Sequence, residues 1–289
     1  MKKIIFALII TFFSQQLTFA QQAWTSPKGK FYSQLGYTSL VYDGSNKAYD
    51  EIIPLNRKIT HNALQGYIQY GITDKLMVTG IVPLTFTSSK LTSGTQPTGL
   101  SDGSLNGLGN IQTALTYRFY EKNGIVFSGK LNAILPTAQK DVATGLRTGD
   151  DTFGISPSLL AGYGHSKFFT SLEIGGVLRN NNYSNQTFGY FQIGKFMGKK
   201  QKFLMILHSA LRFSNKNGTY DDGNTKYTAT YFNDLRYIAY GLKLGYKVTP
   251  KIMFWSDIRF WASSTEKIGG RTDELGLFPG LTFSVSYQN

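Results

Sequence analysis

The stretch LFPGLTFSVSYQ, residues 277–288, shows most clearly how this chain folds. Apolar side chains occupy one set of alternate positions, and small or polar side chains occupy the other, with Phe278 as the single large apolar exception. Because successive side chains of a β-strand point to opposite faces, this period of two predicts a strand with one apolar face. Residues 236–247 and 152–164 repeat the pattern, and Leu160 is the exception in the latter.

The composition indicates that much of the surface faces something other than water. The 289 residues are 41% hydrophobic, 15% aromatic and only 16% charged, whereas about 25% charged residues is typical of soluble domains. The chain has a formal net charge of +13 and contains no cysteine. Disulfides, thiolate metal sites, cysteine nucleophiles and a lipidated cysteine are therefore excluded.

Residues 1–20 have the layout of a secretory signal peptide. Lys2 and Lys3 precede an apolar core at residues 4–13, and a polar stretch follows that ends at Ala20. A membrane-spanning anchor needs about 20 apolar residues, and this core is much shorter. We therefore expect cleavage after Ala20 and a single exported domain at residues 21–289. Nucleic acid is not an expected partner of an exported chain.

The remaining chain is predicted to form strands joined by alternately short and long connections. A tight turn at residues 73–75 and a long loop at residues 137–151 are examples of the two kinds. The best count is twelve strands, although the intermediate loop at residues 179–185 and the ambiguous faces of residues 186–197 keep ten or fourteen open. We expect the twelve strands at residues 31–42, 61–72, 76–87, 107–119, 125–136, 152–164, 168–178, 186–197, 202–214, 233–247, 252–263 and 276–288.

Two architectures produce strands with one apolar face. A soluble sandwich buries that face, whereas an outer-membrane barrel turns it to lipid and encloses the polar side chains. The predicted strands exceed the roughly 5 to 6 residues usual in soluble sheets and match the roughly 9 to 11 that cross a bilayer. We therefore predict an all-β, transmembrane antiparallel β-barrel of the outer-membrane type, in contact with the outer-membrane lipid of a Gram-negative-type bacterium.

Two pairs of adjacent carboxylates raise the question of a cation site. Asp150 and Asp151 follow one long loop, and Asp221 and Asp222 lie in another. Adjacent residues on an extended chain point apart, and no Asp-x-Asp-x-Asp spacing of a calcium loop is present. We interpret both pairs as turn signals, in which Asp bonds nearby backbone amides, with a cation at Asp150 and Asp151 as the alternative. No metal or cofactor is expected.

The chain is not expected to be an enzyme. A barrel that hydrolyses lipids of the outer leaflet needs histidine and serine on its lipid-facing surface. His165 falls in a short turn, His61 lies near an outer strand end, and His208 alternates with inward positions. No Gly-x-Ser-x-Gly motif is present, and the Gly-Leu-Gly at residues 107–109 is followed by no predicted helix that could receive a phosphate.

Alternation along the strands also predicts which charged side chains face the lumen. The set contains seven basic and two acidic residues, so we expect a net positive interior that attracts anions and opposes cations. The alternative is that these charges pair across the lumen and merely fill it, and a one-residue slip in register would reverse an assignment. The predicted lumen-facing residues are Arg118, Lys130, Glu173, Arg179, Arg212, Lys243, Lys247, Asp257 and Arg259.

Several motifs in the N-terminal and central chain carry a resemblance to a known family. They are QYGITDKL (69–76) with VPL (82–84), GLGN (107–110) with TYRF (116–119), LPT (135–137), and LRTGDD (146–151). In this order they resemble the "Putative MetA-pathway of phenol degradation" family of transporter-like outer-membrane proteins. From about residue 200 onward we recognise no motif of that family. The resemblance implies a transporter or channel, with aromatic or other small hydrophobic compounds suggested by the family's description.

The predicted strand number limits the size of the cargo. A barrel of about twelve strands is narrower than a porin of about 16 to 18 strands and wider than the eight-stranded type that its side chains fill. We therefore expect passive passage of small solutes, with organic anions or aromatic acids favoured by the basic lumen. The alternative is a structural or partner-binding barrel of a cell-surface assembly without transport activity. A homo-oligomer is compatible with either.

Overall fold

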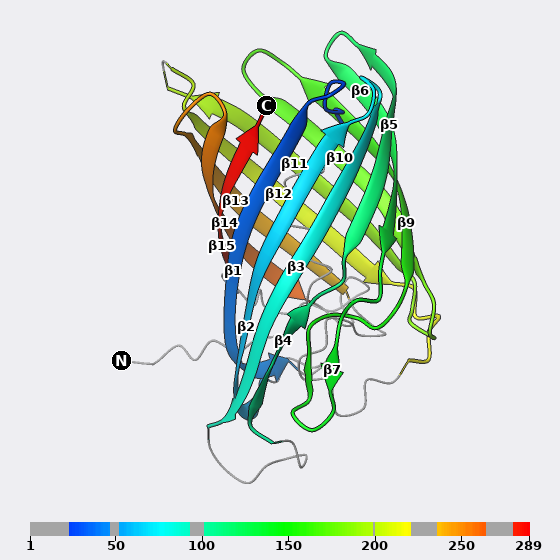
Figure 1. Ribbon diagram of the computed structural model, residues 1–289, viewed down its shortest axis with the longest axis vertical. Coiled ribbons are helices and arrows are strands. Elements are labelled where there is room, and N and C mark those ends of the chain that lie inside the picture. The colour runs from blue at the N-terminus through cyan, green and yellow to red at the C-terminus, as the bar shows by residue number, and fades with distance from the viewer. Residues whose placement is uncertain (1–22, 47–51, 93–100, 199, 221–235, 264–279) are drawn as a thin grey trace.

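The computed structural model describes residues 23–46, 52–92, 101–198, 200–220, 236–263 and 280–289. These residues form an all-β structure in which one large antiparallel sheet closes on itself as a barrel (Figure 1). Within these ranges, no helix is long and apolar enough to cross a membrane. The prediction of an antiparallel β-barrel is confirmed. The expected signal peptide, residues 1–20, and the pair Asp221 and Asp222 lie outside the described residues.

Thirteen strands make up the barrel, and β4 and β5 lie end to end beside β3, so the wall is twelve strands around, as predicted. Two further strands, β7 and β8, form a short hairpin in a long loop. In chain order the strands are β1 (Phe31–Asn46), β2 (Ile52–Gly71), β3 (Leu76–Leu91), β4 (Gly103–Leu108), β5 (Gln112–Lys122), β6 (Ile125–Ile134), β7 (Lys140–Asp141), β8 (Leu146–Arg147), β9 (Gly154–Gly164), β10 (Phe169–Arg179), β11 (Gln186–Met197), β12 (Phe203–Ser214), β13 (Arg236–Lys247), β14 (Ile252–Ser263) and β15 (Gly280–Gln288).

The first and last strands close the barrel. β1 pairs with β15 from Tyr32 opposite Gln288 to Ser39 opposite Leu281, and β2 pairs with both β1 and β3. An unpaired backbone N–H or C=O group is costly in hydrocarbon, so a sheet that faces lipid can have no open edge. The short turns lie together at one end of the barrel, the upper end in Figure 1. In outer-membrane barrels this is the periplasmic end.

The largest departures from the expected strand boundaries are at two places. The strand expected at residues 107–119 is divided into β4 and β5, because residues 109–111 leave the ladder. They lie beside Pro83 of β3, which has no N–H to offer, and the Gly109 N–H donates to the Pro83 carbonyl at 2.9 Å. β2 begins at Ile52 rather than at residue 61, which extends the wall formed by β1, β2 and β3 towards the long loops.

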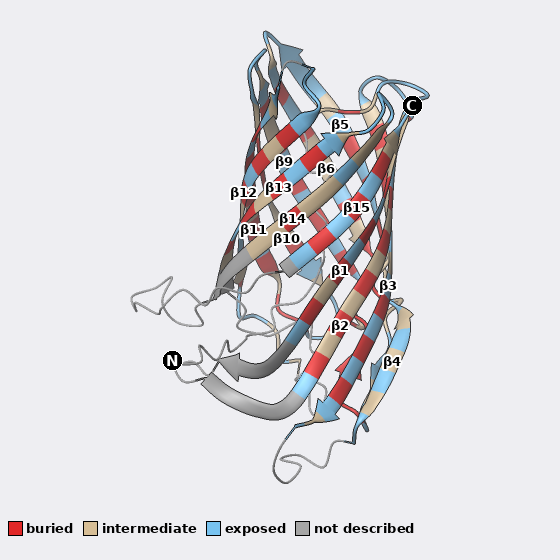
Figure 2. Cartoon of the chain, turned by 90° about the vertical axis from the view of Figure 1, so that its left-hand side faces the viewer, coloured by how far each residue is buried: buried red, intermediate tan, exposed pale blue. Residues whose placement is uncertain are grey.

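The two faces of the barrel wall are opposite to those of a soluble protein. On β9, Ser156 and Ser158 are buried, whereas Leu159 is 68% exposed. Figure 2 shows this alternation as bands of buried and exposed residues along the strands. The exposed side chains of the strands are largely apolar, and the enclosed ones are mainly Ser, Thr, Gln and charged residues. An exposed apolar surface of this extent indicates contact with lipid.

Candidate functional site

The enclosed face of the barrel holds charged side chains that contact one another. The Lys130 Nζ of β6 lies 2.6 Å from the Glu173 Oε1 of β10. The Ser158 Oγ of β9 donates to the same carboxylate oxygen at 2.7 Å. Glu173 is fully buried. Because β9 lies between β6 and β10 in the sheet, this ion pair reaches across a whole strand on the inner face.

A second charged cluster lies on β12, β13 and β14. The His208 Nε2 is 2.9 Å from the Asp257 Oδ1. The Arg259 Nε and Nη2 donate to the Asp257 Oδ2 at 3.1 and 2.9 Å. Lys243 is the cross-strand partner of Asp257 and is only 1% exposed. Two cationic side chains and an imidazole therefore surround a single carboxylate.

Two further predicted lumen residues lie away from these clusters. The Arg212 Nη1 donates to the Gln186 Oε1 at 3.1 Å, and its guanidinium lies 5.9 Å from the ring centre of Phe188. Arg179, the last residue of β10, lies near the long-loop end of the barrel, 3.7 Å from Asp150. The charges of the predicted set are thus distributed along the barrel and do not form a single ring.

A cavity of about 500 Å³ opens at the periplasmic end of the barrel. Lys243, Lys247 and Lys251 line it, together with several aromatic residues. The Lys247 Nζ lies 4.0 Å from the centre of the Phe196 ring, in the geometry of a cation–π contact. Arg118, at the rim of the same end, pairs with Glu121 at 2.5 Å. The volume is within the range of about 300–1,000 Å³ that is usual for small-molecule sites.

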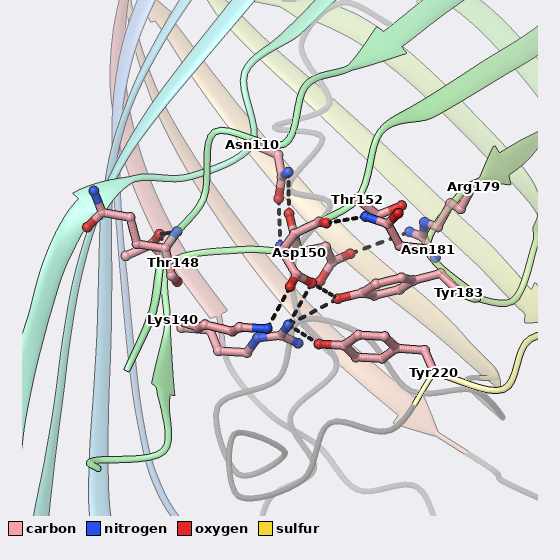
Figure 3. A network of polar contacts seen from close by, with 12 residues as sticks. Asn110, Lys140, Thr148, Asp150, Thr152, Arg179, Asn181, Tyr183 and Tyr220 are labelled. Atoms are coloured by element: carbon pink, nitrogen blue, oxygen red, sulfur yellow. Dashed lines mark hydrogen bonds and ion pairs between the residues drawn. The ribbon is translucent and has the colours of Figure 1, made fainter. Parts of the chain in front are cut away.

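At the long-loop end, segments that are distant in the sequence meet at Asn110 (Figure 3). The Asn110 Nδ2 donates to the carbonyls of Leu135 and Asp150 at 2.8 and 2.6 Å, and its Oδ1 accepts the Asp150 N–H at 2.7 Å. Gly149 packs so closely against Asn110 that a Cβ there would collide with the amide. The GLGN, LPT and LRTGDD motifs therefore form one junction, which holds the loop of residues 135–153 against the barrel mouth.

The carboxylate of Asp151 binds side chains from two segments of the chain. The Lys140 Nζ lies 2.8 Å from its Oδ2, the Arg147 Nη2 lies 3.0 Å from its Oδ1, and the Tyr183 hydroxyl donates to Oδ1. Arg147 also donates to the hydroxyls of Tyr183 and Tyr220, whose rings stack 3.9 Å apart. Partial burial would raise the pKa of Asp151, but hydrogen bonds from Lys140 and Tyr183 and the charge of Arg147 lower it to about 2.

The acidic turn therefore holds loops together through cations that belong to the chain. Within the described residues, no cluster of three or more His, Asp or Glu side chains could hold a metal ion. Sequence reasoning missed Arg147 and Tyr183, because loop residues carry no alternation that would mark them. It also missed that His208 bonds to Asp257, since 49 residues separate the two in the chain.

The closed barrel, apolar outside and charged inside, defines the class of protein. It is an outer-membrane β-barrel of a Gram-negative-type bacterium. A family model with the description "Putative MetA-pathway of phenol degradation" matches residues 14–272, so the chain belongs to this family. The family resemblance read from the sequence motifs is confirmed.

A solved outer-membrane channel shows the same fold, and two porins are similar at lower scores. The COG4313 outer membrane channel from Pseudomonas putida F1 is similar with a TM-score of 0.69 at 12% identity, over 92% of this chain and 98% of that chain. The NanC porin has a TM-score of 0.48 at 6% identity, over 88% and 97% of the two chains. The KdgM porin has a TM-score of 0.46 at 8% identity, over 88% and 98%. Among curated proteins, no sequence matches this chain.

Proposed function

We propose that this barrel is a channel for the passive passage of small solutes, and that its basic lumen favours organic anions, including aromatic acids. The proposal is carried by the cavity at the periplasmic mouth, which Lys243, Lys247 and Lys251 line inside a closed wall. Cations that line a narrow, low-dielectric passage raise the local concentration of anions and oppose cations. The description of the similar solved structure as an outer membrane channel supports the first part, and the family's description motivates aromatic acids as probes.

The ion pairs of the lumen reduce this positive charge without removing it. Glu173 offsets Lys130, and Asp257 offsets Arg259. The two acids are the only ones among the nine residues predicted to face the lumen, and seven of the nine are basic. Lys243 and Lys247 add to the charge at the cavity itself. The proposed interior therefore keeps an excess of cations along its length.

Conductance in planar bilayers tests the proposal. In a salt gradient we expect the reversal potential of the wild-type barrel to show a preference for anions. The double variant Lys243→Gln/Lys247→Gln should lose much of that preference, whereas Lys195→Gln, which removes an exposed lysine of β11, should keep it. A preference for cations in the wild type would contradict the basic-lumen proposal. Blockade by benzoate but not by benzylamine would extend it to aromatic acids.

One observation favours a second candidate function, a structural or partner-binding barrel. The inner face is closely packed around Glu173, Lys243 and Asp257, since each is no more than 1% exposed. If side chains closed the whole lumen in this way, the barrel would conduct nothing. Folded barrel that gives no conductance, and that co-purifies with a fixed partner, would favour this alternative. A homo-oligomer also stays a prediction, which the mass of the barrel in detergent would test.

We further infer that the barrel is not a lipid-hydrolysing enzyme. His208 bonds to Asp257 inside the barrel and is 5% exposed, and His61 is 4% exposed. An enzyme of the outer leaflet would present its histidine to lipid. Incubation of folded barrel with phospholipid vesicles should therefore release no fatty acid, and release that is lost in His208→Ala would contradict this inference.

A further inference from the structure

The periplasmic end of the barrel carries a belt of aromatic side chains on its outer surface. These exposed rings lie beside the short turns and pack in pairs, with ring centres 5.0 to 6.5 Å apart. The pairs are Phe119 with Phe127, Tyr163 with Phe168, and Phe203 with Tyr246. Exposed aromatic rings of a barrel gather where the hydrocarbon meets the lipid headgroups. The headgroups of the periplasmic leaflet therefore lie level with the short turns, at the upper end in Figure 1.

The same end of the barrel is strongly basic. In the part of this end that the structure describes, two side chains are acidic, Asp74 and Glu121. Each already binds a group of the chain, since Asp74 accepts the Lys28 N–H at 2.9 Å and Glu121 pairs with Arg118. By contrast, an exposed lysine lies in or next to each short turn. These lysines are Lys75, Lys122, Lys167, Lys200, Lys202 and Lys251.

Next to the turn between β11 and β12, the outer wall contains an apolar groove of about 600 Å³. Met197, the last residue of β11, and Phe203, the first residue of β12, line the groove on either side of that turn. Further along the groove, Ser256 of β14 lies on the outer face between Leu244 and Phe283, which are both exposed. The short serine between two large side chains leaves a depression in the lipid-facing surface.

A second groove of about 540 Å³ continues the first one across β1 to β2 and β3. The two grooves share Leu35 and Val285. In the second groove, Gly66 lies between Leu35 and Val82, whose side chains are exposed. A Cβ added at Gly66 would meet the Val82 carbonyl oxygen at 3.9 Å, an ordinary contact, so the position has room for a side chain. Two joined grooves on the lipid-facing surface fit the two acyl chains of one phospholipid.

We propose that an anionic phospholipid of the periplasmic leaflet binds here, with its acyl chains in the two grooves and its phosphate at Lys200 and Lys202. Both lysines are exposed and belong to the turn that Met197 and Phe203 flank. A lysine can lay its alkyl stem along apolar surface and keep its ammonium group at the level of the headgroups. Each lysine beside anionic lipid strengthens binding roughly fivefold. Such a site lies on the outer wall and is independent of solute passage through the lumen.

Native mass spectrometry of the folded barrel tests this site. Delipidated barrel in detergent is mixed with equal amounts of dioleoyl phosphatidylglycerol and dioleoyl phosphatidylcholine, which have identical chains. We expect the anionic lipid to give at least about fivefold more adduct. Lys200→Gln/Lys202→Gln should reduce this ratio to within about twofold, because the charge at the groove is lost. Lys122→Gln/Lys167→Gln, which removes two exposed lysines of other turns at the same end, should keep it.

A variant with filled grooves tests the binding of the acyl chains. Ser256→Leu/Gly66→Leu should lower the adducts of both lipids at least twofold and leave their ratio unchanged. Ser209→Leu is the matched control, because Ser209 lies on the outer face of β12 between Phe191 and Tyr240 and lines neither groove. Heat-modifiable gel mobility confirms that each variant is folded.

Three results would overturn the proposal. Equal adducts of the two lipids in the wild type would show that the headgroup charge does not direct binding. An equal fall of the ratio in both lysine variants would show a general attraction of the basic end, without a site at the turn between β11 and β12. Adducts that inorganic phosphate displaces, and that the filled grooves leave unchanged, would show an ion site that holds no acyl chain. The conductance of the barrel is measured separately, so none of these results decides whether it is a channel.

Discussion

The stability that a buried charge in the lumen contributes depends strongly on the charged group beside it. The carboxylate of Glu173 is fully buried, and the Lys130 Nζ that lies 2.6 Å away is its cationic partner. Removing one member of such a pair leaves the other desolvated and without its counter-charge. Replacing both with neutral groups removes that penalty. The energetic effect of each residue is therefore a property of the pair.

Neutralising one member of this pair should destabilise the barrel more than neutralising both. We expect Lys130→Gln and Glu173→Gln each to lower the free energy of unfolding by about 3–5 kcal/mol, and the double variant to recover most of the loss. Urea unfolding in detergent, followed by tryptophan fluorescence, measures both effects. Lys195→Gln, at an exposed lysine of β11, is the matched control and should change stability by less than about 0.5 kcal/mol. Additive losses in the double variant would show that the pair is not coupled.

The titration of Asp151 should report the network at the long-loop end. Its pKa is lowered from 3.8 to about 2, so its ionised form stabilises the docked loop at pH values above about 4. That contribution is lost as the pH falls through the folded-state pKa near 2. The carboxyl ¹³C chemical shift of Asp151, assigned by its loss in Asp151→Asn, should titrate with a midpoint well below 3.8. Lys140→Met should raise the midpoint, and an unshifted wild-type midpoint would contradict the network.

The loop of residues 135–153 is held in one position because the Asn110 side chain bonds it to the barrel wall. The side chain of Asn110 satisfies two carbonyl groups and one N–H group of the loop. These are buried or half-buried backbone groups, and a polar group left without a partner there costs about 1–3 kcal/mol. The break between β4 and β5 is what places Asn110 at this junction. A departure from regular strand structure thus positions the loop.

Asn110→Ala should therefore release the loop while the barrel stays closed. A loss of about 1–3 kcal/mol corresponds to a roughly 5- to 150-fold larger population of the undocked loop. We expect trypsin to cut after Lys140 and Arg147 faster in this variant by at least the lower factor. Asn106→Ala, at an exposed position of β4, is the control and should be cut at the wild-type rate. Equal rates in Asn110→Ala and wild type would show that other contacts hold the loop.

The whole molecule is arranged for a solvent that is apolar. Outward residues such as Leu159 and Phe283 are 68% and 55% exposed, whereas the polar side chains are enclosed. In water such an arrangement would be unfavourable, because apolar surface would be hydrated and charges would be desolvated without need. In a bilayer the apolar surface contacts lipid and the charges are kept out of the hydrocarbon, so both effects favour the fold. The pairing of β1 with β15 over Tyr32–Ser39 then covers the edge between the first and last strands.

Leu159→Arg should test this arrangement for the barrel as a whole. A cation on the lipid face near the bilayer midplane costs about 2–4 kcal/mol, whereas an exposed leucine of a soluble protein tolerates arginine within about 0.5 kcal/mol. We expect a lower folded fraction in lipid vesicles, read from heat-modifiable gel mobility. Ser166→Arg, in an exposed periplasmic turn, is the control. A folded fraction equal to that of the wild type would contradict contact of this face with lipid.

The sequence by itself determined the class of fold and favoured twelve strands, whereas only the structure excluded ten and fourteen. A period of two assigns each side chain to a face locally, so strands such as β9 and β13 could be predicted without knowledge of their neighbours. Loop lengths then indicated a barrel, and the GLGN, LPT and LRTGDD motifs indicated the family. The motifs did not reveal that they meet at one junction. Their spacing along the chain does not show which strands are neighbours in the closed barrel, and it is the barrel that brings the motifs together.

Only the tertiary structure decided which residues are partners. Lys130 meets Glu173 across β9, His208 meets Asp257, and Ala23 reaches the wall at Gly162. Each contact depends on strand register and on the stagger of the closed barrel, which are collective properties of all strands. Alternation along a strand shows which face a side chain is on. It does not show which side chain of an adjacent strand lies beside it on that face. The pairing of lumen charges and the contact of Ala23 with the wall therefore became visible only with the closed barrel.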